Sequence, residues 1–508
     1  MARGHLARER PNALGLVLAL GAFLGALAWL QLGFPRLVDG DSYFHARAAQ
    51  QLAEHGIRTE FPQAAFSTWR DRYSDKDFLF HLFLIPFVGE EASLRGGKIA
   101  VIAADALLLA GFGLALARLR VRFAALFVLL LASADPWLWI HLLALRPHLL
   151  GLALLLLEIA LALEGRWKAL AAASAAHVLA HTSFLLLPAL PLAQMAAAGL
   201  RREPLPWRPA AGVGLGIAAA SLLHPYFPNN LTIAFDQAVE VARSVAGTRP
   251  ELPRDLFGSE LLPMTAAGLL QVWPVWLAAG AGQAALLLRW PAQSPSREAL
   301  SLAGLALALL AVCGLANRFA AFFLPVAALA AARAWSELAG AAPLAALARR
   351  PAAWAGALLL AACVLCGQLR AWPGAVRASL LRLSHPVEDA RGAVAFLERR
   401  AAPEDVVYHN FWMPFAALYY FRPDGRYIEA LDPIFLYRFD PELFAGMLAV
   451  YRGEAPDPHR VIARDFGARF VFVRKLPSEQ AMARGIARDP RFRRVYDDPG
   501  ASVFEVAP

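Results

Sequence analysis

The sequence predicts a polytopic α-helical membrane protein of about eleven spans, followed by a C-terminal extracytoplasmic α/β domain. Of its 508 residues, 58% are hydrophobic and only 18% are charged, whereas soluble domains are about 45–50% apolar and about 25% charged. The apolar residues gather in runs of about 20, the length that crosses a bilayer. Near residue 371 these runs become short and charges become frequent.

The predicted spans follow one another from the N-terminus with short connections. They cover residues 12–33, 97–117, 123–140, 147–163, 167–181, 183–200, 209–225, 261–288, 298–316, 319–335 and 353–369. The apolar segment 78–88 is too short to cross, so we expect it to lie at the membrane surface or to re-enter. The first run is too long for a cleaved signal and is expected to be a retained anchor.

Lysine and arginine in the short loops predict the orientation, because cytoplasmic loops are enriched in these residues. The N-terminal tail holds three arginines, and every second loop is basic: 118–122, 164–168, 201–208, 288–298 and 349–350. The N-terminus is therefore expected in the cytoplasm. Eleven spans then place residues 371–508 in the periplasm, with the chain in the inner membrane.

The net charge of +9 divides into +1 for residues 371–508 (19 basic, 18 acidic) and +8 for the rest. The excess thus follows membrane topology and favours anionic lipid as its partner. It gives no support to a nucleic-acid partner. All three cysteines lie inside apolar runs, which argues against a disulfide framework or a zinc site.

The chain therefore divides into a membrane domain, 1–370, with a long outer loop, 34–96, and a domain of residues 371–508. In the second, strands are expected at 405–410, 426–430, 468–475 and 502–506, and helices near 388–400, 440–451, 456–466 and 477–487. This alternation predicts a small α/β domain with a largely parallel sheet. No glycine-rich phosphate loop precedes these helices.

Asp39 and Asp41 flank a glycine where the chain leaves the first span. Two carboxylates at this spacing can share Mg²⁺ or Mn²⁺, or one can act as a base for an attacking hydroxyl or amide. They can equally be turn-forming and capping residues of a helix over 42–55. Metal-independent chemistry stays open.

Further polar residues gather at the predicted outer face. His45 follows Asp41 by one helical turn and could orient its carboxylate or bind substrate. Ionisable residues at the edge of a bundle are costly and are usually kept for a role. The substrate-binding candidates are His45, Asp75, Asp77, His81, Asp135, Arg146, His148 and Arg318.

Arg318 is the sharpest candidate, since it is a strong charge within a long apolar stretch. Its forked donors could hold a lipid phosphate. An arginine whose side chain simply extends to the membrane surface is the alternative. For the cluster around Asp75 and Asp77, the alternative is a solvated loop.

The aspartates after the first span, the long outer loop, the many spans and the outer α/β domain together resemble the GT-C glycosyltransferase superfamily. DGDSYFHARAAQQLAEHG looks like the first outer loop of oligosaccharyltransferase catalytic subunits. A group of bacterial GT-C-like proteins is similar in the order D-x-D-x-x-x-H, IRTEFP, LRPHLL, HPY and NRFAAFFLP, with VYHNFWMPFAALYYF and RYIEALDP in the C-terminal domain. The resemblance covers most of the chain.

The resemblance implies transfer of a sugar from a polyprenyl phosphate or diphosphate carrier to a glycan, lipid or protein acceptor at the outer face. Asp41 carries over as the catalytic acidic residue, with Asp39 beside it to bind a metal or activate the acceptor. Arg318 carries over as the arginine that holds the lipid-linked phosphate, and Asp135 as a second outer acidic position.

Two family motifs are incomplete. The W-W-D motif is absent, and the nearest sequence, His409–Trp412, lacks the aspartate. The T-I-x-E motif has Phe235 in place of its glutamate, although Asp236 follows. Glycosylation of asparagine sequons is therefore not implied. The alternatives are a polytopic lipid or glycan transporter and a non-catalytic GT-C-like scaffold. The absence of internal repeats and the crowding of charges at one face favour an enzyme over a transporter.

Overall fold

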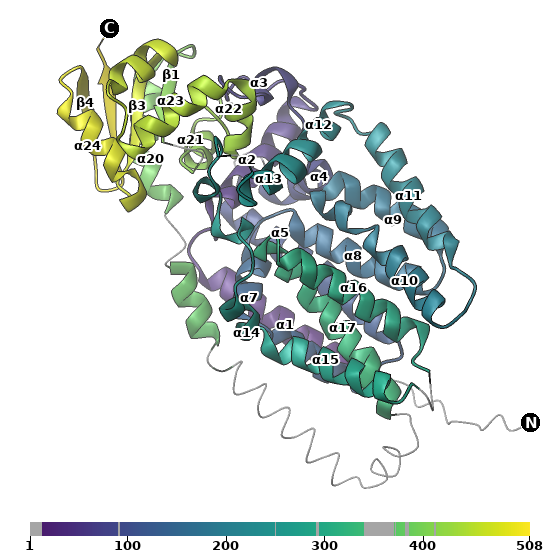
Figure 1. Ribbon diagram of the computed structural model, residues 1–508. Helices are drawn as coiled ribbons and strands as arrows, with labels where there is room; N and C mark the ends of the chain where they lie inside the picture. Colours follow the sequence, from purple (N-terminus) through teal and green to yellow (C-terminus); the bar gives the residue numbers. More distant parts are fainter. Residues whose placement is uncertain are drawn as a thin grey trace, which may run out of the picture.

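The computed structural model describes residues 13–89, 92–248, 250–290, 294–339, 370, 372–381, 386–410 and 413–507. An elongated bundle of helices carries an α/β domain at one end (Figure 1). The eleventh predicted span, 353–369, and the cysteines Cys363 and Cys366 lie outside the described residues.

The helical part contains seventeen labelled α-helices among the described residues. They are α1 (Ala13–Gly33), α2 (Gly40–His55), α3 (Trp69–Arg72), α4 (Phe78–Val88), α5 (Leu94–Arg118), α6 (Ala124–Ala132), α7 (Pro136–Leu143), α8 (His148–Leu163), α9 (Trp167–Ala180), α10 (Ala189–Leu200), α11 (Trp207–Leu222), α12 (Asn229–Phe235), α13 (Val241–Val245), α14 (Ala266–Gln271), α15 (Trp273–Leu288), α16 (Arg297–Cys313) and α17 (Ala320–Ala339).

Short turns complete the connections that later form the site. The 3-10 turns η4 (Ser259–Leu261) and η5 (Asn317–Phe319) precede α14 and α17, and η1 (Thr182–Leu186) precedes α10. A further helix covers residues 372–381.

Helix α17 lies in the middle of the bundle, and its residues 321–332 are all buried. Small residues allow other helices to approach closely, as is common where helices pack in membranes. On α11, a Cβ at Gly212 would lie 2.6 Å from the carbonyl oxygen of Trp167, and one at Gly216 would lie 2.3 Å from that of Ala171. The two glycines thus let α11 pack against the backbone of α9.

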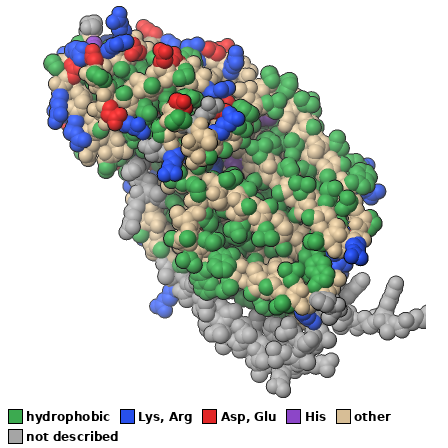
Figure 2. Space-filling view, in the orientation of Figure 1, with side chains coloured by type: hydrophobic (Ala, Val, Ile, Leu, Met, Phe, Trp, Pro, Cys, Tyr) green, Lys and Arg blue, Asp and Glu red, His purple; other side chains and the backbone are tan. Residues whose placement is uncertain are grey.

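Within the described residues, four helical segments are long and apolar enough to cross a membrane: 13–33, 94–118, 182–200 and 317–339. A fifth results if α6 and α7, which are bent by 86° at residues 133–135, form one broken span. The predicted count of eleven is therefore not confirmed. Hydrophobic side chains cover the visible face of the bundle, whereas acidic and basic side chains gather on the C-terminal domain (Figure 2). The protein is an integral membrane protein.

The segment predicted as one span over 123–140 is broken into two helices, α6 and α7. Asp135 caps α7 by accepting a hydrogen bond from the backbone N–H of Trp137 at 3.1 Å, and Pro136 occupies the first helical turn. An aspartate N-cap followed by proline starts a new helix. The chain therefore turns at this point instead of continuing α6.

The outer loop folds into helices that cover one end of the bundle. Asp39 caps α2 through the backbone N–H of Ser42 at 2.9 Å, as the capping interpretation predicted. The apolar segment predicted not to cross is α4, whose 11 residues pack against α2 and α5. Its short length and these contacts keep it at the end of the bundle.

The C-terminal domain contains η6 (Val387–Ala390), α20 (Arg391–Arg400), β1 (Val406–His409), α21 (Phe415–Phe421), β2 (Arg426–Tyr427), α22 (Pro433–Phe439), α23 (Pro441–Arg452), η7 (Arg460–Asp465), β3 (Ala468–Arg474), η8 (Pro477–Glu479), α24 (Gln480–Arg488), β4 (Phe492–Asp497) and β5 (Ala501–Val506). Its five strands form one sheet in the order β2-β1-β3-β5-β4.

The prediction of a largely parallel sheet is half wrong. Strand β1 pairs in parallel with β2 and β3, but β5 pairs antiparallel with β3 and with β4. Strand β4 was not predicted. Asp498 forms the turn after it by accepting backbone hydrogen bonds from Gly500 and Ala501, both at 2.8 Å. So tight a turn can join only antiparallel strands.

The outer loop and the C-terminal domain are joined by backbone hydrogen bonds. The N–H of Ala65 donates to the carbonyl of Tyr427 at 2.8 Å, and the N–H of Tyr427 donates to the carbonyl of Gln63 at 2.7 Å. The N–H of Phe66 donates to the carbonyl of Ile428 at 3.0 Å. This strand-like pairing at the β2 edge fixes the domain over the loop that carries Asp39 and Asp41.

Candidate active site

A cavity of about 340 Å³ lies where the outer loop, the bundle and the C-terminal domain meet. Its walls come from the start of α2, the 73–81 segment, α7, the start of α8, η4, η5 and the 431–435 segment. The polar residues that line it are Asp39, Asp41, His45, Ser74, Asp75, Lys76, Asp77, His81, His141, Arg146, His148, Gln237, Ser259, Glu260, Asn317, Arg318 and Asp432. Most of the predicted site residues therefore share one cavity.

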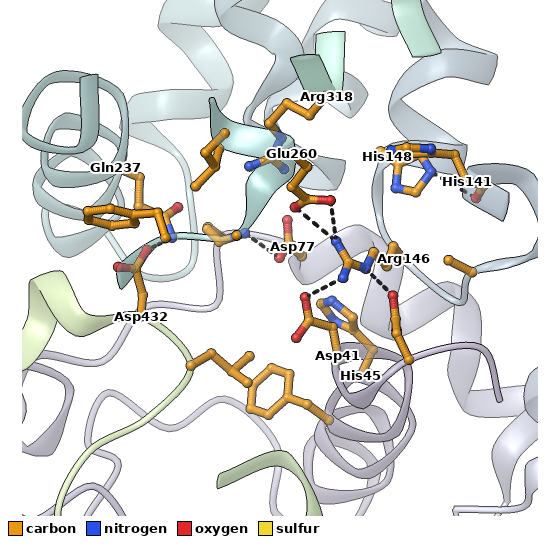
Figure 3. A pocket seen from close by; sticks show the side chains of 18 of the residues that line it. Asp41, His45, Asp77, His141, Arg146, His148, Gln237, Glu260, Arg318 and Asp432 are labelled. Atoms are coloured by element: carbon orange, nitrogen blue, oxygen red, sulfur yellow. Dashed lines mark hydrogen bonds and ion pairs between the residues drawn. The ribbon is translucent and has the colours of Figure 1, made fainter. Parts of the chain in front are cut away.

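Arg146 lies between three carboxylates (Figure 3). Its Nε donates to Asp39 Oδ2 at 2.7 Å, and its Nη2 lies 3.1 Å from Asp41 Oδ2. Its Nη1 lies 3.1 and 3.3 Å from the two oxygens of Glu260. Every branch of the guanidinium thus meets a carboxylate from a separate position in the chain.

Local structure places each member of this cluster. Asp39 is the N-cap of α2 and Asp41 lies in its first turn, so the two carboxylates leave the helix start side by side. The backbone N–H of Leu145, next to Arg146, donates to Ser42 Oγ at 3.0 Å. This bond fixes the chain before α8 against the start of α2.

Burial and neighbouring charges shift the pKa values of Asp41 and Glu260 in opposite directions. Burial raises the pKa of Asp41 above its ordinary value, with Arg146 opposing the rise and Asp39 adding to it. Burial also favours neutral Glu260, but Arg146 and Arg318 outweigh it and hold the pKa of Glu260 well below its ordinary value. Asp41 is therefore the better proton acceptor and Glu260 a permanent anion.

A chain of three hydrogen-bonded side chains, Asp75, His81 and His45, also lines the cavity. His81 Nδ1 donates to Asp75 Oδ2 at 2.7 Å, because a carboxylate can only accept. His81 Nε2 then accepts from His45 Nδ1 at 2.9 Å. Burial, followed by the nearby His81, lowers the pKa of His45 well below its ordinary value. His45 is therefore neutral and presents Nε2 as an acceptor.

Two further polar pairs border the cavity. Lys76 Nζ donates to Asp77 Oδ2 at 2.7 Å, and the N–H of Asp77 donates to Asp75 Oδ1 at 3.0 Å. His148 Nε2 donates to the carbonyl of His141 at 3.0 Å. Asp75, Asp77, His81 and His148 thus lie at the cavity, but each is engaged with another protein group.

Arg318 differs from the other cations of the cavity. Within the part of the chain that the structure describes, no hydrogen bond or ion pair reaches its guanidinium, whereas Arg146 and Lys76 both contact carboxylates. It stands at η5, directly before α17. Its donors are therefore available to a ligand.

A second, more apolar cavity of about 380 Å³ shares part of its wall with the first. Leucine, alanine, valine and phenylalanine side chains from η1, α13, the end of α16 and α17 line most of it. Lys76, Arg146, Glu260, Arg318 and Asp432 border both cavities. The two spaces therefore meet at a charged boundary, which suits a ligand with a polar head and an apolar tail.

One predicted site residue lies elsewhere. Asp135 is buried and caps α7, and it is not among the residues that line the cavity. Its neighbour Trp137 faces the cavity instead. Asp236, which follows the incomplete T-I-x-E motif, pairs with Arg438 at 3.4 Å and is not among the residues that line either cavity.

Glu260, His141, Gln237 and Asp432 border the cavity but were not predicted. Gln237 Nε2 donates to Asp432 Oδ2 at 3.3 Å, which links the bundle to the C-terminal domain at this boundary. Glu260 could have been found from topology, since it stands at the outer end of a predicted span.

The carboxylates are not arranged for a divalent cation. Within the described ranges, no group of three or more His, Cys, Asp or Glu side chains is placed to hold a metal ion. Oxygens of Asp39, Asp41 and Glu260 are already bonded to Arg146. As arranged, these residues do not fit the expected ion, and dependence on Mg²⁺ or Mn²⁺ stays a prediction.

Comparison with solved structures shows that the fold of this chain is similar to those of two kinds of membrane enzyme. The archaeal oligosaccharyltransferase AglB from Archaeoglobus fulgidus, in complex with an inhibitory peptide and a dolichol-phosphate, superposes with a TM-score of 0.66 at 13% identity. The match covers 97% of this chain and 74% of that one. ArnT from Cupriavidus metallidurans in the apo state gives 0.56 at 16% identity, covering 97% and 98%.

The chain has the GT-C fold. ArnT bound to undecaprenyl phosphate superposes as well, with a TM-score of 0.55 at 15% identity, covering 96% of this chain and 98% of that one. No protein-family model and no curated protein sequence matches the chain. The GT-C resemblance read from the short motifs is thus confirmed at the level of the fold.

Proposed function

We propose that the protein is a glycosyltransferase that moves a sugar or glycan from a polyprenyl phosphate or diphosphate carrier to an acceptor. The transfer would take place at the outer face of the membrane in which the protein lies. The observation that carries this proposal is the meeting of a polar cavity, lined by Asp41, with an apolar cavity at Arg318, which has no partner within the described part of the chain. The solved GT-C relatives, one with a dolichol-phosphate and one with undecaprenyl phosphate, support a lipid-linked donor.

In this proposal the apolar cavity receives the start of the polyprenyl chain and Arg318 binds the phosphate. A guanidinium suits this task because its planar donors match phosphate oxygens. The sugar then extends into the polar cavity, towards Asp41 and His45. A site at the outer face of the membrane suits such a donor, because a lipid carrier can reach the site by moving laterally within the membrane.

The proposed reaction is a displacement at the anomeric carbon. A hydroxyl or amine of the acceptor forms a new bond to that carbon, and the bond from the carbon to the phosphate oxygen breaks with both electrons leaving on the phosphate. The acceptor's proton passes to Asp41, whose raised pKa favours this role. Arg318 stabilises the charge that grows on the departing phosphate.

His45 and the groups behind it are assigned to substrate binding. Its Nε2 can accept a hydrogen bond from a sugar or acceptor hydroxyl, since Asp75 and His81 fix its tautomer. The acceptor is a glycan, a lipid or a protein group other than an asparagine sequon. Asp432 and Gln237 bring the C-terminal domain to the same boundary.

We also propose the finer topology of eleven spans in the inner membrane, with the N-terminus in the cytoplasm and residues 371–508 in the periplasm. The alternation of basic loops supports it. A transporter or a non-catalytic scaffold is the competing function. The clustering of charge at one end of the bundle, beside an apolar cavity, favours the enzyme.

The decisive experiment compares surface glycans and lipid-linked sugars, by mass spectrometry, in cells with and without the gene. Deletion should remove one glycan modification and leave its lipid-linked donor in excess. Wild-type protein should restore the modification and Asp41→Asn should not. Full restoration by folded Asp41→Asn would exclude the catalytic role of Asp41, and an unchanged glycan profile after deletion would reject the proposed function.

A further inference from the structure

Arg146 lies between the two aspartates that follow the first span and a third carboxylate, Glu260. Its guanidinium contacts Asp39, Asp41 and Glu260 through three different nitrogens, at 2.7, 3.1 and 3.1 Å. These carboxylates come from the start of α2 and from η4, so only the fold brings them to one point. An assembly of this kind is what a divalent cation usually organises.

We propose that Arg146 replaces a divalent metal ion in this site and makes the transfer reaction metal-independent. The inference rests on the proposed function for its catalytic part and on ion binding for its structural part. The guanidinium supplies one fixed positive charge and directional donors, so it gathers the carboxylates without any bound ion. A metal could enter only by displacing it.

The surroundings of Arg146 support a role beyond an ordinary surface ion pair. Its side chain is 22% exposed, and those of Asp39, Asp41 and Glu260 are 24%, 29% and 31% exposed, all towards the cavity that they line. Desolvation strengthens interactions between such groups relative to water. The fixed cation therefore lies beside the space proposed for the sugar.

The three carboxylates around Arg146 have different contacts and therefore different roles. Asp39 is additionally held by the N–H and hydroxyl of Ser42, at 2.9 and 2.7 Å, so it anchors Arg146. Glu260 holds the other side of the guanidinium from η4. Asp41 contacts Arg146 through Oδ2 alone among the described residues, which leaves its Oδ1 for an acceptor.

Removing Arg146 should convert the cluster into a cation site. Three carboxylates without a counter-charge repel one another and bind Mn²⁺ readily, since hard cations prefer oxygen ligands. The test uses the purified full-length chain in detergent, stripped of metal. Wild type, Arg146→Ala, Arg146→Gln and the control Arg208→Ala, which alters an exposed arginine on α11, are titrated with Mn²⁺.

Two readouts are independent of catalysis. Mn²⁺ binding is measured by electron paramagnetic resonance, and stability by thermal unfolding with and without Mn²⁺, because a ligand that binds only the folded state raises the midpoint. We expect Mn²⁺ to bind and stabilise Arg146→Ala and Arg146→Gln, but not the wild type or Arg208→Ala. If Arg146→Ala does not fold without metal, Arg146→Gln supplies the same comparison.

The third readout is transfer activity. Chelators should leave the wild-type rate unchanged, and Arg146→Ala should lose about 100-fold or more, the loss expected for one essential charge-stabilising group. Mn²⁺ bound by the wild type and lost in Asp39→Asn, or no gain of Mn²⁺ binding in either folded Arg146 variant, would overturn the inference. Failure of the proposed function would instead appear as no transfer under any condition, with the Mn²⁺ comparison still deciding the role of Arg146.

Discussion

Asp41 and Arg146 are in contact across the floor of the cavity, with Oδ2 of Asp41 lying 3.1 Å from Nη2 of Arg146. The two residues approach from α2 and from the chain before α8. The contact orients the carboxylate, while burial keeps its pKa above the ordinary value. This relationship leads to the first two predictions.

Asp41→Asn should lower kcat for sugar transfer by about 100- to 10,000-fold, the range that general-base catalysis contributes. The amide keeps the shape of the side chain but cannot accept the acceptor's proton. The measurement is transfer from a purified polyprenyl-linked donor. Asp71→Asn is the matched control, since Asp71 belongs to the same outer loop, is exposed, and pairs with Arg70. Equal losses in both variants would exclude a specific role for Asp41.

The rate should fall at acidic pH as Asp41 becomes protonated, because a general base acts only when deprotonated. Its raised pKa places this fall above the ordinary aspartate value of about 3.9. Arg146 lowers the pKa of Asp41, so Arg146→Gln should move the fall to still higher pH. The check is the pH dependence of kcat/KM for both proteins. An unmoved profile would show that another group controls the acidic limb.

Arg318→Ala should raise KM for the lipid-linked donor or lower kcat/KM by about 10- to 100-fold, as expected when hydrogen bonds to a charged group are lost. Arg318→Lys should recover part of the loss, because lysine keeps the charge without the planar fork. Steady-state kinetics with varied donor concentration make the measurement. Arg208→Ala serves as the control. Wild-type kinetics in Arg318→Ala would show that Arg318 does not bind the donor phosphate.

His45→Ala and Asp75→Asn should each reduce transfer, because Asp75 fixes His45 only through His81. Residues that act as one unit give non-additive effects. The double variant should therefore be little worse than His45→Ala alone. Thermal unfolding of each variant separates loss of structure from loss of function. Fully additive losses in folded proteins would contradict the three-residue chain.

Glu429→Gln should make the stability of the protein less sensitive to a rise in pH between 4.5 and about 8. Glu429 is fully buried, and neither of its oxygens has a hydrogen-bond partner among the described residues. Burial raises its pKa from 4.5 to about 8. The folded state thus holds a proton that the unfolded state releases, so stability falls as pH rises between these two values. Glutamine has no such proton, and the slope should flatten.

Thermal unfolding of the wild type and Glu429→Gln between pH 5 and pH 9, a range about the shifted pKa, tests this expectation. The control is Glu442→Gln, which changes an exposed residue of α23. Parallel curves for wild type and Glu429→Gln would show that Glu429 does not control the stability of the domain in this range.

Local patterns in the sequence determined much of the architecture. The Asp39–Gly40–Asp41 text predicted a capped helix and the structure has α2 there. The short apolar segment predicted not to cross is α4, and the short apolar runs predicted as strands contain β1, β2, β3 and β5. Such features depend on residues close in sequence, whose spacing alone expresses the periodicity of a helix or strand.

The sequence also predicted the two ends of the proposed donor site, Asp41 and Arg318, because polar residues at the edge of an apolar run stand out. It could not predict the sharp bend between α6 and α7, since hydropathy measures the length of an apolar segment and not its direction. Asp135 was therefore expected at the site, whereas its carboxylate caps α7.

The pairing of Arg146 was decided only by the tertiary structure. Its partners Asp39 and Glu260 lie 107 and 114 residues away in the chain, and no local pattern connects them. Packing of α2, η4 and the start of α8 brings these charges within hydrogen-bond distance, and each then limits what the others can bind. The sequence by itself determined that acidic and basic residues meet at one membrane face; the fold decided that a guanidinium lies among the carboxylates, because ion pairing depends on distance in space.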